Sequence, residues 1–251
     1  MNLRASYKYV MNDNKKALLG YSLIIIAVTV LLFIATISWS NDSNTMQIGG
    51  MEMASMIFIF IAGLTAFKEN FHMLTQNSVS RKGTFTATML GFVTSSAMLS
   101  VISILVLLIA KLMSHFQSNI ISESFFERIY IGHVAGMNDI VVFLESLLLY
   151  FVMLLMIVSI GYLIGVIFYR LNKIGKVALA VGIPVFFTVI LPVVDVLIFD
   201  GQITIGIIRF MDIIFGISAQ NPYLAVVSCL VIFLITGLLS WFTMRKAPMK
   251  A

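Results

Sequence analysis

Charged side chains are scarce in this sequence. Lys, Arg, Asp and Glu make up 11% of the 251 residues, and hydrophobic residues make up 60%. Soluble domains average about 25% charged and about 45–50% apolar residues. The few charges also cluster between long apolar runs, which excludes a water-soluble fold. Because the runs lack the alternation of barrel strands, we expect an all-α membrane protein.

Cysteine and catalytic motifs are equally sparse. The single cysteine, Cys229, excludes an internal disulfide and makes metal ligation unexpected. The sequence has no HExxH or GxSxG pattern, and Gly175–Lys176 lacks the upstream glycine of an ATP-binding P-loop. The histidines have no ligand spacing and are interpreted as solvated loop residues: His72, His115 and His133. We therefore expect no enzyme activity, no cofactor, no metal and no nucleic-acid partner on this chain.

Six apolar runs are long enough to cross a bilayer, which takes about 20 residues. With their connections they fill nearly the whole chain, so a single transmembrane domain over residues 1–251 is predicted, with no room for a cytosolic catalytic domain. The first run is too long for a signal peptide and is expected to remain as a span. The predicted spans are residues 17–39, 51–67, 84–113, 140–168, 176–199 and 222–243.

The basic residues orient these spans. Thirteen of the 16 Lys and Arg residues fall in alternate connections counted from the N-terminus, and the other side holds only Lys111, Arg128 and Arg209. Basic residues near span ends accumulate on the cytoplasmic side. An even number of spans, with both termini in the cytoplasm, is therefore predicted.

The N-terminal segment has its own pattern. Leu3, Tyr7, Val10 and Met11 recur at helical spacing among basic residues. This favours an amphipathic helix lying along the cytoplasmic interface. A plain positive anchor is the alternative.

The connection at residues 67–83, FKENFHMLTQNSVSRKG, is more structured than a simple loop. Its apolar residues share one face and its polar residues lie elsewhere, so a helical extension ending near Gln76 and Asn77 is predicted. Ser78 or Ser80 is available to cap the next span. The apolar set is Phe67, Phe71 and Leu74, and the polar set is Lys68, Glu69 and His72.

Two segments on the predicted outer side also have patterns that predict local structure. Ser124 followed by Glu127 forms a capping box, which predicts a short surface helix. Residues 203–218 are apolar but short, and they place Arg209 and Asp212 on one face. Since a charge near the bilayer centre is costly, we expect this segment to form a re-entrant hairpin that dips into the outer leaflet and returns.

Small residues and prolines within the spans predict their packing. Gly161 and Gly165 form a GxxxG pattern that permits close helix approach, within the chain or in a dimer. Pro184 and Pro192 in the fifth span predict kinks.

Two acidic residues lie inside spans, Glu145 and Asp195, each about one turn from the outer end. One interpretation makes them part of a substrate or cation pathway, because ionisable groups within a membrane usually serve a function. The other has them reaching outward to the interface.

These features together resemble the permease subunits of ABC-2 type exporters. The family has an amphipathic N-terminal helix, six spans, a cytoplasmic coupling helix after span two and an outer hairpin before span six. The string FKENF...QNSVSRKGTF (residues 67–85) is similar to the matching segment of small bacterial permeases. There a glycine is commoner at Ser78, and Asn77 is expected to supply the left-handed turn instead.

The resemblance implies a permease in the bacterial cell membrane that pairs with a second permease subunit, like or unlike. Two separate ATPase subunits would carry ATP and Mg²⁺. The implied cargo is an amphipathic peptide or antimicrobial compound, as for bacitracin, lantibiotic or phenol-soluble modulin exporters. An ion-coupled transporter or channel acting without an ATPase is the alternative, and a structural or assembly subunit is a third. The implied coupling residues are Phe67, Lys68, Glu69, Phe71, His72, Leu74, Arg81 and Lys82.

Overall fold

The computed structural model describes residues 3–39, 46–47, 51–116, 120–121 and 123–245. Within these ranges, six helical stretches are long and apolar enough to cross a membrane. They coincide with the six predicted spans, so this prediction is confirmed. The chain is accordingly a multi-pass membrane protein by its architecture. The stretches are Leu3–Ala35, Glu52–Gln76, Arg81–Leu112, Asp139–Arg170, Lys173–Ile198 and Pro222–Arg245.

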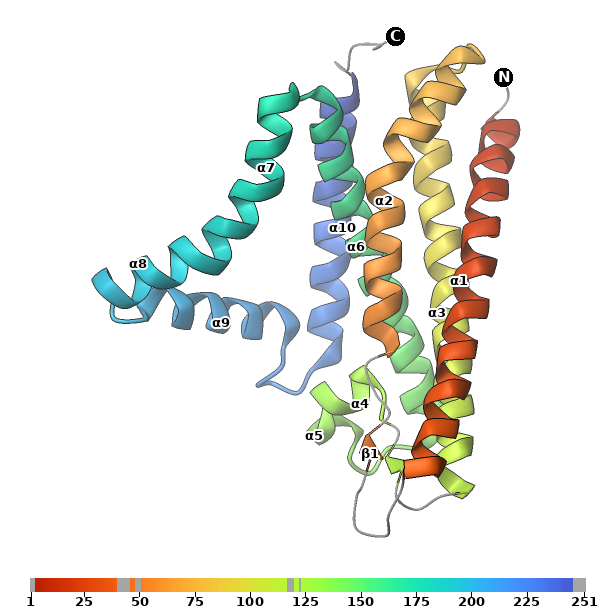
Figure 1. Ribbon diagram of the computed structural model, residues 1–251, viewed down its shortest axis with the longest axis vertical. Coiled ribbons are helices and arrows are strands. Elements are labelled where there is room, and N and C mark those ends of the chain that lie inside the picture. Colours follow the sequence, from red (N-terminus) through yellow and green to blue (C-terminus); the bar gives the residue numbers. More distant parts are fainter. Residues whose placement is uncertain (1–2, 40–45, 48–50, 117–119, 122, 246–251) are drawn as a thin grey trace.

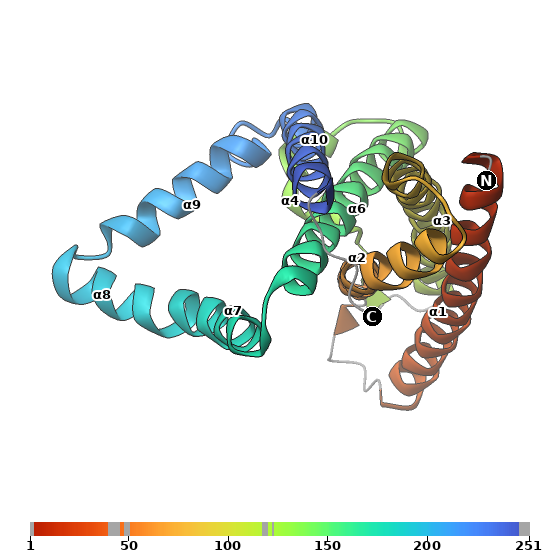
Figure 2. The same cartoon turned by 90° about the horizontal axis from the view of Figure 1, so that it is seen from above.

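Three long helices pack around a fourth. Helix α6 (Asp139–Arg170) is central and contacts α2 (Met51–Gln76), α3 (Arg81–Phe116) and α10 (Pro222–Arg245) (Figure 2). Helix α1 (Leu3–Trp39) lies outside this group and packs mainly on α3. The buried core therefore runs along α6.

The seam between α2 and α6 depends on glycines. A Cβ atom placed on Gly161 or Gly165 would lie 2.5 or 2.4 Å from a backbone carbonyl oxygen of α2. Gly63 of α2 likewise approaches the backbone of α6, since a Cβ placed on it would lie 2.4 Å from the carbonyl oxygen of Val158. The GxxxG pattern thus serves packing within the chain, because only a residue without a side chain allows this approach.

Helix α1 differs from the predicted N-terminal arrangement. It is one continuous helix, and no separate interfacial helix forms over its described start. Val10 and Met11 are buried against α3, where the hydroxyl of Thr94 donates to Met11 Sδ at 3.0 Å. Val10 and Met11 of the predicted apolar face thus cover a neighbouring helix, whereas Leu3 is 46% exposed.

The fifth span is broken as its prolines predict. Helix α7 (Lys173–Val185) contains Pro184, a π-helical turn η1 (Phe186–Ile190) follows, and α8 (Leu191–Ile198) begins beside Pro192. Proline removes a donor and crowds the preceding turn, which favours such a wider turn. The span leans away from the bundle (Figure 1), and none of its α7 or η1 residues is buried.

The predicted re-entrant hairpin at residues 203–218 does not form. These residues belong mostly to one uninterrupted helix, α9 (Gln202–Phe215), which leads from α8 back to α10 (Figure 1). The chain turns only at its two ends, where Gly201 and Gly216 have φ angles of 79° and 60°. The prediction failed because residues 203–215 stay helical throughout, Gly206 included, and the left-handed conformations that turn the chain occur at Gly201 and Gly216.

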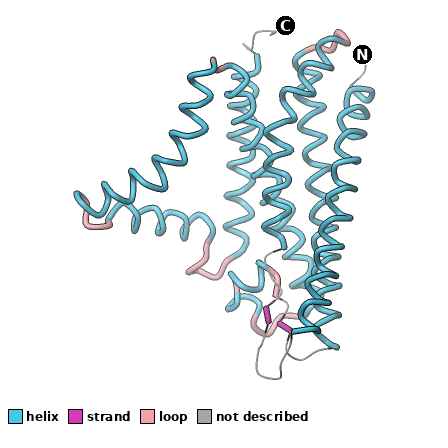
Figure 3. The backbone as a smooth tube through the Cα atoms, in the orientation of Figure 1, coloured by secondary structure: helices cyan, strands magenta, loops and turns pink. Residues whose placement is uncertain are grey.

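A small cap closes the end of the bundle opposite the termini (Figure 3). It comprises α4 (Phe125–Ile129), α5 (Ile131–Val134) and a parallel pair of two-residue strands, β1 (Met46–Gln47) with β2 (Ile120–Ile121). The predicted capping box is present: Glu127 N donates to Ser124 Oγ at 3.0 Å, and Ser124 N donates to Glu127 Oε2 at 2.8 Å.

The stability of α4 is expected to depend on pH through Glu127. Burial raises its pKa, but bonds from Lys111, at 2.5 Å, and from Ser124 outweigh burial and hold the pKa below the usual 4.5. A carboxyl group with a lowered pKa stabilises the folded state fully above its unfolded pKa, and this contribution is lost as pH falls through the folded value. Hydrogen exchange of the α4 amides should therefore show weaker protection below pH 4.5.

The controls for this prediction lie in the same cap. Glu127→Gln should remove the pH dependence, and Glu123→Gln, at an exposed neighbour, should leave it. The same loss of protection in Glu127→Gln as in the wild type would assign the effect to another carboxyl group.

Candidate functional site

One end of the bundle gathers the basic residues. The start of α1, the α2–α3 turn, the α6–α7 junction and the end of α10 all lie at this end (Figure 1). We call it the basic end. Its described Lys and Arg residues are Arg4, Lys8, Lys15, Lys16, Lys68, Arg81, Lys82, Arg170, Lys173, Lys176 and Arg245.

The α2–α3 connection is a tight turn at the tip of an extended helix. Helix α2 continues to Gln76 as predicted, and α3 begins at Arg81 with Ser80 as its cap, since Gly83 N donates to Ser80 Oγ at 3.2 Å. The left-handed residue is Ser78, with φ 59°, and not Asn77 as predicted. It is the position at which the family that this segment resembles more often has glycine.

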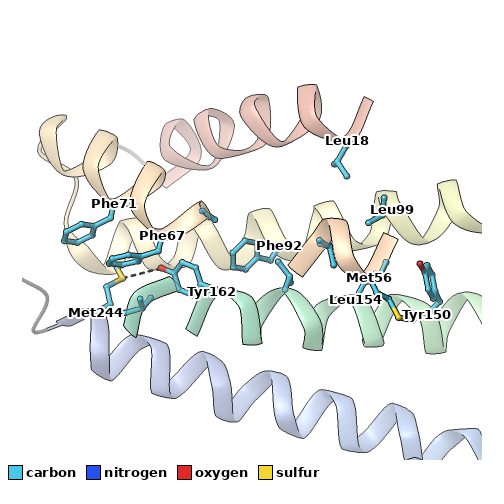
Figure 4. Close-up of a cluster of buried hydrophobic side chains, with 14 residues drawn as sticks. Leu18, Met56, Phe67, Phe71, Phe92, Leu99, Tyr150, Leu154, Tyr162 and Met244 are labelled. Carbon is cyan, nitrogen blue, oxygen red and sulfur yellow. Dashed lines mark hydrogen bonds between the residues drawn. The ribbon is translucent and has the colours of Figure 1, made fainter. Parts of the chain in front are cut away.

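Aromatic packing holds the extension of α2 in place. The Phe67 and Phe71 rings stack at 5.0 Å (Figure 4), and Tyr169 of α6 meets Phe67 edge-on at 5.2 Å. The hydroxyl of Tyr162 donates to Met244 Sδ of α10 at 3.6 Å beneath them. Three helices therefore meet in one cluster.

A groove of about 1100 Å³ runs beside this cluster, and charged side chains stand on its otherwise mostly apolar walls. Helix α2 contributes Lys68, Glu69 and His72 to its wall, and all three are exposed. His72 Nε2 lies 3.0 Å from the side-chain nitrogen of Gln76. The start of α1 contributes Tyr9 and Asp13 to the groove, and the region where α6 passes into α7 contributes Phe168, Tyr169 and Lys176.

The predicted coupling residues fall into three groups. Phe67, Phe71 and Leu74 are 1%, 2% and 1% exposed, so they anchor the extension and offer no surface to a partner. The exposed polar set of α2 lines the groove. Arg81 and Lys82 lie elsewhere: Arg81 donates to the Arg245 carbonyl oxygen, and Lys82 lines a different groove, between α3 and α10.

Glu145 is engaged at the opposite end. Its carboxylate lies 2.9 Å from His133 Nε2 of α5 and accepts a bond of 2.5 Å from the hydroxyl of Tyr223 on α10. His133 is therefore not the solvated loop residue that was predicted, and His72 also lies in a helix. Sequence reasoning missed this cluster because its three members are far apart along the chain.

Asp195 is buried and hydrogen-bonded to the backbone of α9. Its two carboxylate oxygens accept from Ile203 N and Thr204 N at 2.8 Å each, and the residue is 1% exposed. These amides are among the unpaired donors of the first turn of α9. Asp195 thus caps α9 across a turn, at a separation longer than any local capping motif.

Arg209 and Asp212, the two charged residues of α9, have different surroundings. Asp212 Oδ1 accepts from Ser218 N at 2.8 Å and closes the far end of the helix. Arg209 is exposed. Asp195 and Asp212 therefore stabilise opposite ends of α9.

Comparison of the chain with protein-family models, curated proteins and solved structures found no match. In the part of the chain that the structure describes, no group of three or more His, Cys, Asp or Glu residues is arranged to hold a metal ion.

Proposed function

We propose that this chain is the permease subunit of an ATP-binding-cassette exporter in the cell membrane. The basic end faces the cytoplasm, and the groove beside α2 receives a separate ATPase subunit. The observation that carries the proposal is the extension of α2, which is exposed and charged on one face and anchored in the bundle core on the other.

The groove suits a docking surface for a cytosolic partner. It carries both signs of charge, with Lys68 and Lys176 beside Glu69 and Asp13. Complementary charges of this kind orient a partner and raise its rate of association. The Phe67 cluster behind the groove then connects a movement of the partner to α6 and α10. A coupling element requires both properties.

The acids in the spans do not favour the alternative, an ion-coupled transporter or channel. Such a protein uses free ionisable groups or interrupted helices near the membrane midplane. Glu145 and Asp195 instead hold a histidine, a tyrosine and a helix terminus. The interrupted fifth span is the one feature that both functions share.

The partners and cargo follow from the same proposal. A second permease subunit, like or unlike, stands beside this one, and the unburied α7 and η1 are free to meet it. Two ATPase subunits carry ATP and Mg²⁺. The cargo is an amphipathic peptide or antimicrobial compound that leaves the cytoplasm or the membrane, a class that rests on the resemblance alone.

The test is purification of the affinity-tagged chain from its native host, with ATP hydrolysis measured in the eluate. An ATPase should copurify with the wild type. Combined replacement of Lys68, Glu69 and His72 by alanine should weaken its retention at least about tenfold, because charged interface pairs are worth roughly 2 kcal/mol or more. The yield of the chain should stay unchanged, since all three side chains are exposed.

The matched control is Gln202→Ala with Arg209→Ala, at exposed positions of α9 far from the groove. It should retain the ATPase. Equal retention in the groove variant and the control would reject the groove as the docking surface. Transport by liposomes that contain only this chain would instead support the ion-coupled alternative.

A further inference from the structure

A second groove lies at the basic end, on the outside of the bundle between α3 and α10. Its volume is about 440 Å³, and its walls are almost entirely apolar. The rings of Phe85 and Trp241 meet in it at 5.3 Å, and Gly237 leaves its middle open, because a Cβ placed there would have no atom within 4 Å. No function assigned above uses this groove.

The groove lies within one leaflet. Its α10 wall extends over residues 233–241, which corresponds to about 12 Å of helix. Half of the hydrocarbon core of a bilayer is about 15 Å. Trp241 stands near the end of α10, where tryptophan commonly marks the boundary between hydrocarbon and headgroups. The groove therefore begins at the interface and runs inward.

Cations surround the mouth. Lys82 lines the groove and is exposed, and the Arg245 guanidinium lies 5.9 Å from the centre of the Trp241 ring. Arg81 donates to the Arg245 carbonyl oxygen and so joins the two helices there. Among the described residues no carboxylate lines the groove or pairs with Lys82 or Arg245.

The walls offer an occupant almost no hydrogen bonds. The hydroxyl of Thr86, one of the few polar groups present, already donates to the Lys82 carbonyl oxygen at 2.9 Å. An extended peptide would leave its backbone groups unpaired there, which costs several kcal/mol for each group in a membrane. A hydrocarbon chain has no such groups. The groove is thus complementary to an apolar chain that ends in an anion.

We propose that this groove binds a membrane lipid with an anionic headgroup. One acyl chain lies along Phe85 and Gly237, and the phosphate stands between Lys82 and Arg245. Basic pockets between helices on the cytoplasmic side select anionic lipids in this way. The site depends neither on the ATPase partner nor on the identity of the cargo.

The experiment uses the full chain in nanodiscs with a photoactivatable diazirine on the acyl chain of phosphatidylglycerol, or of phosphatidylcholine as the neutral comparison. Crosslinked peptides are then mapped. Phosphatidylglycerol should label α3 and α10 around the groove in preference to phosphatidylcholine. Lys82→Gln with Arg245→Gln should lower that labelling about fivefold for each cation removed.

Two matched variants separate the groove from general surface charge. Gly237→Leu fills the groove and should lower labelling by both lipids, whereas Gly20→Leu, at another glycine with no atom within 4 Å of its Cβ, should not. Lys15→Gln with Lys16→Gln, at exposed positions of the same end, should leave the preference for phosphatidylglycerol unchanged.

Several results would overturn the proposal. Equal labelling by the two lipids would exclude an anionic site, and equal losses from the Lys82/Arg245 and Lys15/Lys16 variants would assign the effect to general charge. A benzophenone side chain at position 86 that crosslinks to a second copy of the chain, and not to lipid, would assign the groove to a protein interface. If Gly237→Leu fails to fold, the Lys82/Arg245 and Lys15/Lys16 double variants still decide the question. Their side chains are exposed, so these substitutions should leave the fold intact.

Discussion

Gly161→Leu is expected to prevent α6 from packing on α2 and to leave no stably folded chain. A Cβ at this position would lie 2.5 Å from the Phe60 carbonyl oxygen and 3.3 Å from Leu64 N. These are backbone atoms of α2, so no side-chain rotation relieves the clash. Gly161→Ala should cost about 1–3 kcal/mol as an overpacked site, and leucine more than about 4 kcal/mol.

The measurement is thermal denaturation of the detergent-purified chain, followed by helix content and by elution as a monodisperse species. Gly20→Leu is the control, because the position is helical and open. An unchanged midpoint in Gly161→Leu would mean that α2 and α6 are not in contact. Gly165→Leu should behave like Gly161→Leu, since its Cβ would lie 2.4 Å from the Leu64 carbonyl oxygen.

Phe67→Ala is expected to lower the free energy of unfolding by about 3–5 kcal/mol, the usual loss when a buried phenylalanine is truncated. The ring is 1% exposed and touches three others, those of Phe71, Tyr162 and Tyr169. Its removal opens a cavity where α2 meets α6. The loss should appear first as weaker hydrogen-exchange protection at the end of α2.

Met73→Ala provides the control for Phe67→Ala, because Met73 is exposed on the same helix. It should change the unfolding free energy by less than about 0.5 kcal/mol. Phe67→Leu should fall between the two, since it keeps much of the volume. Equal stability of Phe67→Ala and Met73→Ala would contradict the anchoring of the extension and would weaken the coupling role proposed for it.

Features that depend on neighbouring residues were predictable. The six spans, the kinks beside Pro184 and Pro192, the capping box at Ser124 and the end of α2 at Gln76 all follow from patterns within a few turns of chain. Helical periodicity and capping act over three or four residues. They are therefore visible without knowledge of the fold.

Features that join distant parts of the chain were not predictable in the same way. Nothing near Asp195 indicates that it caps α9, and nothing near His133 indicates Glu145 as its partner. The course of residues 203–218 was mispredicted because their charges suggested a hairpin, whereas the chain reverses at Gly201 and Gly216. The acids proved to be structural once their partners were known.

Only part of the candidate site was predictable from the sequence. The pattern of residues 67–83 identified the α2 extension and separated its apolar face from its polar face. It did not show that Asp13 and Lys176 share a groove with Lys68, nor that Lys82 lies with Trp241 at another one.

The sequence by itself determined that six stretches are long and apolar enough to cross a membrane and where the basic residues collect, because those properties follow from local hydrophobicity and charge. Only the tertiary structure decided which helices touch. Gly161 and Gly165 carry a packing signal that fits several partners equally well. Which helix packs against these glycines depends on the surfaces of all the helices together, and one stretch of sequence does not contain that information.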